Sequence, residues 1–218
     1  MILRILYLNP NSTQAMTDSM VASARAVLPQ AEIMGWTNTD GPPAIQGAAD
    51  GAAAVPGLLA MLPRAREAGA EVLVIGCFDD TGLEELRAAA HCPVIGIGQS
   101  AYHMATLRGA RFSVLTTLPV SVPVIQDNIR AQGFAGVCDT VHPSGISVLE
   151  VEDGTPPVME KLAADLASLA RLGTGAVVLG CAGMSAHLHA LQATATVPLI
   201  DGVRAAAGLA AALVVTRA

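Results

Sequence analysis

Positively charged residues are scarce in this sequence. Lysine occurs once, at Lys161, and lysine and arginine together number 12 against 18 acidic residues, which gives a formal net charge of -6 over 218 residues. Because the sequence has no basic cluster, we expect no nucleic-acid partner. Lys161 lies in a polar-faced helical stretch, so we interpret it as a surface residue and not as the Schiff-base lysine of a pyridoxal-phosphate enzyme.

Long apolar runs are also missing. The longest, residues 205–215, is too short to cross a bilayer, and the N-terminus enters a strand pattern at Ile2 without a secretory signal. The four cysteines lack the spacing of a disulfide framework or a metal site, which is typical of reduced thiols in a cytosol. We therefore predict a cytoplasmic protein with no membrane partner.

Histidine clusters and a complete dinucleotide-binding motif are absent as well. The five histidines are scattered, and His187 and His189, two residues apart on a predicted helix, point in different directions. The stretch 96–98 (Gly-Ile-Gly) lacks the third glycine of the nicotinamide fingerprint. We expect no metal site and no cofactor.

One apolar run occurs twice. Residues 72–77 (Val-Leu-Val-Ile-Gly-Cys) and residues 177–181 (Val-Val-Leu-Gly-Cys) each predict a buried parallel strand with a cysteine at its C-terminal end. Each cysteine is followed by a helical stretch and then by a second apolar strand. The repeat predicts two similar half-domains that each present one thiol to a shared cleft.

Strands and helices alternate through both halves, and the composition, 52% hydrophobic with 3% aromatic residues, suits a sheet core covered by alanine-rich helices. This alternation predicts an α/β fold with two pseudo-symmetric lobes, each a parallel four-stranded sheet flanked by helices, and an active site in the cleft between them. We expect residues 1–98 plus 205–218 to form the first lobe and 99–204 the second. The expected strands cover 2–8, 31–36, 72–76, 94–97, 111–117, 136–141, 177–180 and 197–201, and the expected helices 14–28, 52–68, 81–90, 99–108, 120–132, 157–172 and 203–215.

Polar motifs follow the predicted strands. Right-handed crossovers place the C-terminal ends of parallel strands on one edge of a sheet, and ligands bind beyond that edge. This arrangement predicts a small-molecule site there. The motifs at the edge are 9–13, 37–43, 77–81, 116–117, 142–145 and 181–184.

Two thiols at one cleft indicate proton transfer at a carbon atom. A thiolate on one face of the carbon can take a proton, and a thiol on the other face can return one, which inverts the centre without a cofactor. Both Gly-Cys units precede a predicted helix, whose N-terminus would lower the thiol pKa and stabilise an enolate. The glycine before each cysteine would let the backbone turn sharply.

Buried cysteines at strand ends are common and usually serve as small core residues. The matched positions of Cys77 and Cys181 in the repeat favour catalysis over this alternative. Cys92 and Cys138 have no counterpart in the other half, so we interpret both as structural.

Three motifs carry a resemblance to a known family. They are residues 9–13 (Asn-Pro-Asn-Ser-Thr), 76–83 (Gly-Cys-Phe-Asp-Asp-Thr-Gly-Leu) and 180–184 (Gly-Cys-Ala-Gly-Met). Together they resemble the aspartate/glutamate/hydantoin racemase superfamily, in particular its hydantoin and allantoin racemase branch. The resemblance covers essentially the whole chain. It implies a cofactor-independent, two-cysteine racemase with two α/β lobes and a C-terminal helix that packs back on the first lobe.

By this resemblance, Cys77 and Cys181 would be the acid/base thiols, and Asn11 and the backbone around Phe78 and Ala182 would hold the polar groups of the substrate. Further substrate contacts are expected from the same sheet edge, from Asp79, Thr81, Thr116, Thr117 and Gly183.

The sequence departs from the branch in two places. Residues 43–46 read Pro-Ala-Ile-Gln, where hydantoin racemases often carry a serine and a glutamate. The pair Asp79-Asp80 is the second departure, because a carboxylate near Cys77 would raise its thiol pKa. We expect Asp80 to cap the following helix and to point away from the sulfur.

The candidate motifs contain no arginine or lysine, which favours a neutral ring, a 5-substituted hydantoin or allantoin, over a dicarboxylate. Two alternatives stay open: an aspartate- or glutamate-type racemase or a related decarboxylase or isomerase, and a non-catalytic small-molecule binder. The alanine-rich helix 205–215 leaves a homo-oligomer open as well.

Overall fold

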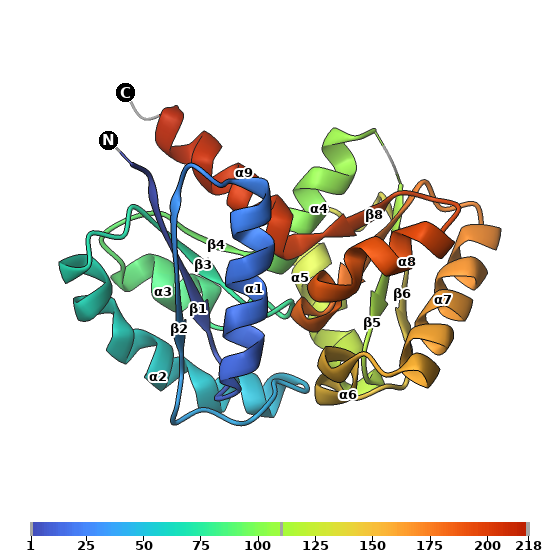
Figure 1. Cartoon of the computed structure of the whole chain (residues 1–218), viewed down its shortest axis with the longest axis horizontal. Helices are drawn as coiled ribbons and strands as arrows, with labels where there is room; N and C mark the ends of the chain where they lie inside the picture. The colour runs from blue at the N-terminus through green and yellow to red at the C-terminus, as the bar shows by residue number, and fades with distance from the viewer. Residues whose placement is uncertain (1, 110, 217–218) are drawn as a thin grey trace.

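The computed structural model describes residues 2–109 and 111–216 and contains two lobes that lie side by side (Figure 1). The first contains β1 (Arg4–Asn9), α1 (Gln14–Val27), β2 (Glu32–Thr37), α2 (Ala48–Glu67), β3 (Val72–Ile75), α3 (Leu83–Ala89) and β4 (Val94–Gly96). Helix α4 (Ile97–Leu107) leads into the second, which contains β5 (Phe112–Thr116), a 3₁₀ helix (Pro119–Ser121), α5 (Val122–Ala131), β6 (Cys138–Pro143), α6 (Val148–Asp153), α7 (Pro156–Arg171), β7 (Ala176–Gly180), a 3₁₀ helix (Ala182–His187), α8 (Leu188–Thr194) and β8 (Leu199–Asp201). Helix α9 (Gly202–Val215) follows.

Within the described residues, the strands form two parallel four-stranded sheets of equivalent topology, in the orders β2-β1-β3-β4 and β6-β5-β7-β8. The predicted α/β class with two parallel sheets is therefore confirmed. Strands β3 and β7, which lead into the two cysteines, are interior strands: β3 pairs with β1 and β4, and β7 pairs with β5 and β8. Interior strands are hydrogen-bonded along both edges, so they fix the position of the cysteine that follows each of them.

Alternate residues of the interior strands enter different hydrophobic cores, as the two-residue period of a strand requires. In β1, Ile5 and Tyr7 join a large core that also contains Phe112 and Ala206, whereas Leu6 and Leu8 join a smaller one beneath α2 and α3. The opposite face of the second sheet packs against α7 and α8. The large core includes residues of both sheets, so the lobes share buried apolar surface.

Helix α9 returns from β8 to the first lobe, where it packs against α1 and α4 (Figure 1). The Tyr7 hydroxyl of β1 donates a hydrogen bond of 2.8 Å to the carbonyl of Val203 at the start of α9. The assignment of residues 1–98 plus 205–218 to the first lobe and 99–204 to the second stays a prediction. Residues 1, 110, 217 and 218 lie outside the described part of the chain.

Several predicted boundaries differ from the structure. Helix α3 begins at Leu83 and not at Thr81, because Asp80 (φ 48°) and Gly82 (φ 71°) adopt left-handed backbone conformations. Helix α2 begins at Ala48, four residues before the expected start, and the short helix α6 was not expected.

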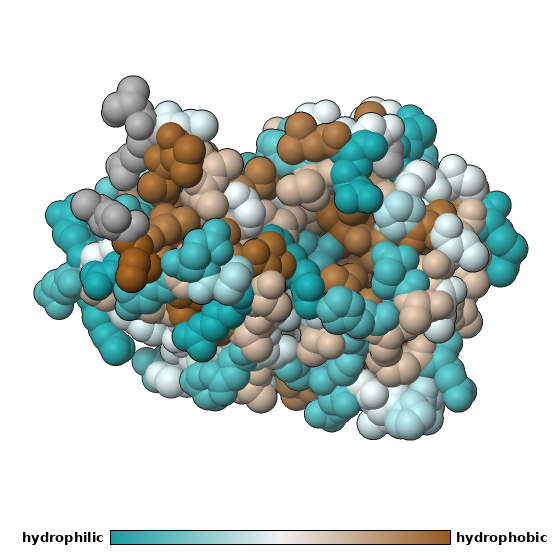
Figure 2. All heavy atoms as spheres, turned by 45° about the horizontal axis from the view of Figure 1, so that its top comes forward, coloured by the Kyte–Doolittle hydropathy of each residue, from teal (hydrophilic) through white to brown (hydrophobic). Residues whose placement is uncertain are grey.

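Hydrophobic and polar side chains are interspersed over one face of the molecule, as Figure 2 shows. Within residues 2–109 and 111–216, no helix is both long enough and apolar enough to cross a bilayer.

Candidate active site

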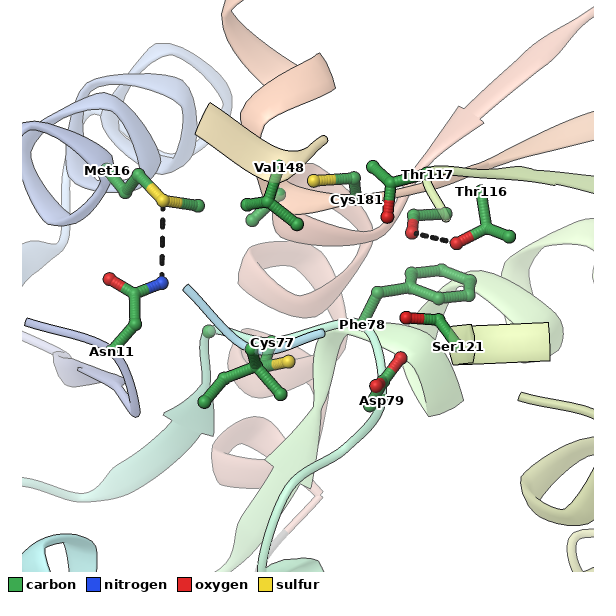
Figure 3. A pocket seen from close by; sticks show the side chains of 14 residues that line it. Asn11, Met16, Cys77, Phe78, Asp79, Thr116, Thr117, Ser121, Val148 and Cys181 are labelled. Atoms are coloured by element: carbon green, nitrogen blue, oxygen red, sulfur yellow. Dashed lines mark hydrogen bonds between the residues drawn. The ribbon is translucent and has the colours of Figure 1, made fainter. Parts of the chain in front are cut away.

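Cys77 and Cys181 line one pocket between the lobes. Figure 3 shows the two side chains on opposite sides of this pocket, Cys77 from the first lobe and Cys181 from the second. The space among the lining residues is about 350 Å³, including the part open to solvent. The lining residues are Asn11, Met16, Ile45, Gly76, Cys77, Phe78, Asp79, Thr116, Thr117, Ser121, Val148, Gly180, Cys181 and Ala182.

The amide group of Asn11 is oriented by its neighbours. Its Oδ1 accepts hydrogen bonds from Asn9 Nδ2 and from the backbone N–H of Thr13, both 2.9 Å long. These donors assign the amide, so that its NH₂ group faces Met16 across one side of the pocket (Figure 3). There Nδ2 donates to Met16 Sδ at 3.4 Å, and a thioether is a weak acceptor. Asn11 therefore offers a donor that a carbonyl oxygen of a ligand would satisfy better.

Hydroxyl groups of the second lobe form another side of the pocket. Thr117 and Ser121 point their hydroxyls toward the region of Phe78 in Figure 3. Thr116 is fixed by donating a 3.1 Å hydrogen bond to the carbonyl of Gly180, its register partner in β7. The pocket therefore combines apolar walls with a few convergent polar groups, which is typical of a small-molecule site.

Both thiols have a raised pKa, contrary to the expectation that helix N-termini lower it. Burial raises the pKa of Cys77 well above its usual value, and the charge of Asp79 adds to this effect. Burial also raises the pKa of Cys181 to about 12, with contributions from Glu152 and Asp79. Cys77 is followed by a turn and not by a helix, since Asp80 N donates to its carbonyl. Loss of hydration therefore outweighs the local dipoles.

Each sulfur nevertheless has donors that favour its ionised form. Backbone N–H groups of Gly183 and Met184, in the 3₁₀ helix after Cys181, act on that thiol, and the side chain of Thr81 acts on Cys77. These donors partly offset the effect of burial on the pKa of each thiol. The interaction between the two cysteines also contributes to the pKa of Cys77, which places them within electrostatic reach of each other.

Asp80 does not cap the helix that follows it. Its carboxylate instead accepts hydrogen bonds from the backbone N–H groups of Gly98 (2.9 Å) and Gln99 (2.8 Å), so it caps the more distant helix α4. The left-handed backbone at Asp80 turns the side chain this way, toward β4 and α4. Burial raises its pKa to about 7.

Asp79 is the carboxylate that lines the thiol pocket. Burial and the nearby charge of Asp80 raise its pKa to about 7. Its carbonyl accepts a 2.8 Å hydrogen bond from Asn128 of α5, which ties the loop after Cys77 to the second lobe. Its Oδ2 is buried without a hydrogen-bond partner among the described residues.

Two of the expected substrate contacts lie outside the pocket lining. Thr81 faces the neighbouring cleft between α2 and α5, and Gly183 lies behind Cys181 against Glu152. The structure brings the others together: Asn11, Cys77, Phe78, Asp79, Thr116, Thr117, Cys181 and Ala182. Cys92 and Cys138 do not line this pocket.

Sequence reasoning missed four pocket residues, Met16, Ile45, Ser121 and Val148, together with Glu152, which acts on Cys181. The internal repeat of the sequence could have indicated two of these residues. Ile45 lies in the loop after β2 and Val148 lies after the equivalent strand β6, so the two residues occupy comparable places in the two lobes. Glu152 had no such signal, because it reaches Cys181 only through the packing of α6 against the 3₁₀ helix Ala182–His187.

Among residues 2–109 and 111–216, no group of three or more His, Cys, Asp or Glu side chains is placed to hold a metal ion.

Comparisons with known proteins agree with this geometry. The chain is 42% identical over 214 residues to a hydantoin racemase from Rhizobium meliloti, with 97% of this chain and 88% of the relative covered. It superposes on an allantoin racemase from Klebsiella pneumoniae with a TM-score of 0.92 at 39% identity, covering 98% and 88% of the two chains. An allantoin racemase from Pseudomonas fluorescens gives a TM-score of 0.88 at 29% identity, with coverage of 97% and 91%. Since the family model described as Asp/Glu/Hydantoin racemase also matches residues 5–210, the chain belongs to this family of isomerases.

Proposed function

We propose that this protein is a cofactor-independent racemase of 5-substituted hydantoins, allantoin among them, and that Cys77 and Cys181 transfer the proton. The observation that carries the proposal is the arrangement of the two thiols, which follow equivalent interior strands and face one pocket from opposite lobes. The names of the relatives, hydantoin racemase and allantoin racemase, support the choice of substrate.

The reaction follows from this arrangement. The thiolate of one cysteine takes the proton from C5 of the ring, the C5–H bond breaks, and its electron pair moves into the adjacent carbonyl to give an enolate. The thiol of the other cysteine then donates its proton to the opposite face of C5. The product is the mirror-image centre, and the two sulfurs have exchanged their protonation states.

Asn11 holds the carbonyl oxygen on which this negative charge develops. Its NH₂ group faces the pocket and has only the Met16 sulfur as acceptor, so a developing enolate oxygen would be the stronger partner. The described lining residues include no arginine or lysine. A neutral ring suits such a site better than a dicarboxylate, which would lack a counter-ion.

The decisive experiment compares Cys77→Ser and Cys181→Ser with the wild-type protein in D₂O. Circular dichroism follows the loss of optical activity of a 5-substituted hydantoin, and NMR follows exchange at C5, against a blank without enzyme. We expect each variant to lose racemisation by at least about 100-fold, the range of a removed acid or base.

Cys138→Ser is the matched control, because Cys138 lies outside the pocket and should leave the rate unchanged. Racemisation by Cys181→Ser at the wild-type rate would refute the two-thiol mechanism. Turnover of aspartate, glutamate or a small diacid, with none of any hydantoin, would refute the substrate assignment. Tight binding of a hydantoin without C5 exchange would show a binding protein instead.

A further inference from the structure

A second cleft adjoins the thiol pocket. It lies between the start of α2, the loop 79–85 and helix α5, and its volume is about 1130 Å³ including the part open to solvent. Small residues of α2, among them Gly51, keep it wide on one side. Among the described residues, Asp79 alone lines both spaces, and Figure 3 shows its carboxyl group at the rim of the thiol pocket beside Ser121.

Three buried acceptor atoms at this cleft lack a donor among the described residues: Asp79 Oδ2, Thr81 Oγ1 and Gln132 Oε1. Thr81 is only 6% exposed. Its hydroxyl hydrogen can serve the Cys77 sulfur, which leaves the oxygen as an acceptor. Gln132 is oriented because its Nε2 donates to Asp80 Oδ2, so its carbonyl oxygen remains available. Buried acceptors without donors are rare in proteins, and an N–H group of a ligand is the kind of partner that each of them lacks.

Acidic side chains predominate at the cleft. Asp79, Asp80, Glu84 and Glu85 line it, arginine and lysine are absent from its described lining, and Arg87 beside it pairs with Glu84 at 2.8 Å. A cleft with carboxylates of one sign attracts cations and repels anions. The ligand that fits these groups is therefore neutral or positively charged.

From these observations we propose that the cleft is the subsite for the substituent on C5 of the hydantoin. It would select substituents that carry N–H donors, such as ureido, amide, amino or guanidino groups, through Asp79, Thr81 and Gln132. This assignment rests on the proposed racemase function and adds to it a rule for substrate choice. The substituent passes Asp79 on its way from the ring between the thiols to the cleft.

The test uses two hydantoins that share the same ring chemistry, 5-ureidohydantoin (allantoin) and 5-methylhydantoin. The measured quantity is the ratio of their kcat/KM values for racemisation, in which any effect of a variant on Cys77 cancels. We expect Thr81→Val, which has the same shape without the hydroxyl, to lower the ratio by about fivefold, the value of one hydrogen bond. Thr81→Ser keeps the hydroxyl and should keep the ratio. Gln132→Leu provides an independent second variant that should lower it as well.

Charge selection has its own measurement. The wild-type protein should racemise 5-(3-aminopropyl)hydantoin faster than 5-(2-carboxyethyl)hydantoin, and added salt should reduce the difference. Equal ratios in Thr81→Val and Thr81→Ser, or a preference for the carboxylate, would overturn the subsite while 5-methylhydantoin is still racemised. Failure of the wild-type protein to racemise either allantoin or 5-methylhydantoin would overturn the proposed function itself, and the subsite with it.

Discussion

Asp79 acts on both cysteines from one position. Its negative charge raises the pKa of Cys77 and also that of Cys181, although the two thiols belong to different lobes. Burial is the larger cause of both shifts, and an ionised Asp79 adds to it because a thiolate beside a carboxylate is unfavourable. The charge of Asp79 therefore affects how easily either thiolate forms.

Replacing Asp79 by Asn should make both thiols ionise at lower pH. The change removes a negative charge, and the charged form of each cysteine is no longer repelled by it, so each thiol pKa falls. Alkylation by iodoacetamide consumes the thiolate and can be followed at each cysteine by mass spectrometry between pH 6 and pH 10. The rate profiles of Cys77 and Cys181 should both shift toward lower pH in Asp79→Asn. The control Asp40→Asn, at an exposed position, should leave them in place, and unchanged profiles in Asp79→Asn would contradict this coupling.

The site residues that could be predicted from the sequence are those that belong to a motif or to the internal repeat. Cys77, Cys181 and Asn11 lie within two residues of a strand end, so their place at the sheet edge followed from the fold class. Asp80 shows the limit of prediction from the sequence. Its role depends on a left-handed backbone angle and on helix α4, which are tertiary features that no local pattern encodes.

At the scale of the element, the glycines before the cysteines have a packing role. Neither Gly76 nor Gly180 has a positive φ, so the sharp turn expected from the sequence is not the reason for glycine there. A Cβ on Gly180 would lie 2.7 Å from the carbonyl oxygen of Leu115 in the adjacent strand β5. A Cβ on Gly76 would lie 2.6 Å from Met20 Sδ, the end of a flexible side chain. The strands can approach their neighbours this closely only because a side chain is absent.

Gly180→Ala should therefore destabilise the protein more than Gly76→Ala. The new methyl group meets main chain that cannot move without disturbing the sheet, which costs about 1–3 kcal/mol of unfolding free energy. At Gly76 the methionine can shift, so the loss should be smaller. Urea denaturation followed by circular dichroism measures both. Gly208→Ala, on α9 where a Cβ meets nothing within 4 Å, is the control and should stabilise by about 0.5–1 kcal/mol. Equal losses of unfolding free energy in Gly180→Ala and Gly76→Ala would contradict this packing role.

Element types were predictable because the periods of hydrophobic residues are local, whereas element starts depend on caps and neighbours. Helix α6 is an example. It is only six residues long, and its capping box between Ser147 and Glu150 is the one local signal that marks it. The start of α3 was likewise displaced by the left-handed residues Asp80 and Gly82.

At the scale of the whole molecule, the two lobes contact each other at the pocket as well as through the shared hydrophobic core. Ile45 from the first lobe and Val148 from the second both line the thiol pocket. Between them, Gln46 Oε1 accepts a 3.4 Å hydrogen bond from the backbone N–H of Val148. The backbone of Gln46 is itself fixed, since its N–H donates to Asp50 Oδ2 at the start of α2. The internal repeat predicted two lobes, but this contact joins residues 102 positions apart and was beyond local patterns.

The contact between Gln46 and Val148 should stabilise the closed arrangement of the two lobes around a bound substrate. Gln46→Ala removes the acceptor without touching the thiols, so we expect KM for a racemised hydantoin to rise about two- to fivefold, the value of one modest hydrogen bond, with kcat nearly unchanged. Steady-state racemisation followed by circular dichroism gives both constants. Gln30→Ala, at an exposed position between α1 and β2, should alter neither. A fall in kcat at constant KM would instead show that Gln46 acts on the chemical step, and would place the loop 43–46 within the catalytic machinery rather than over it.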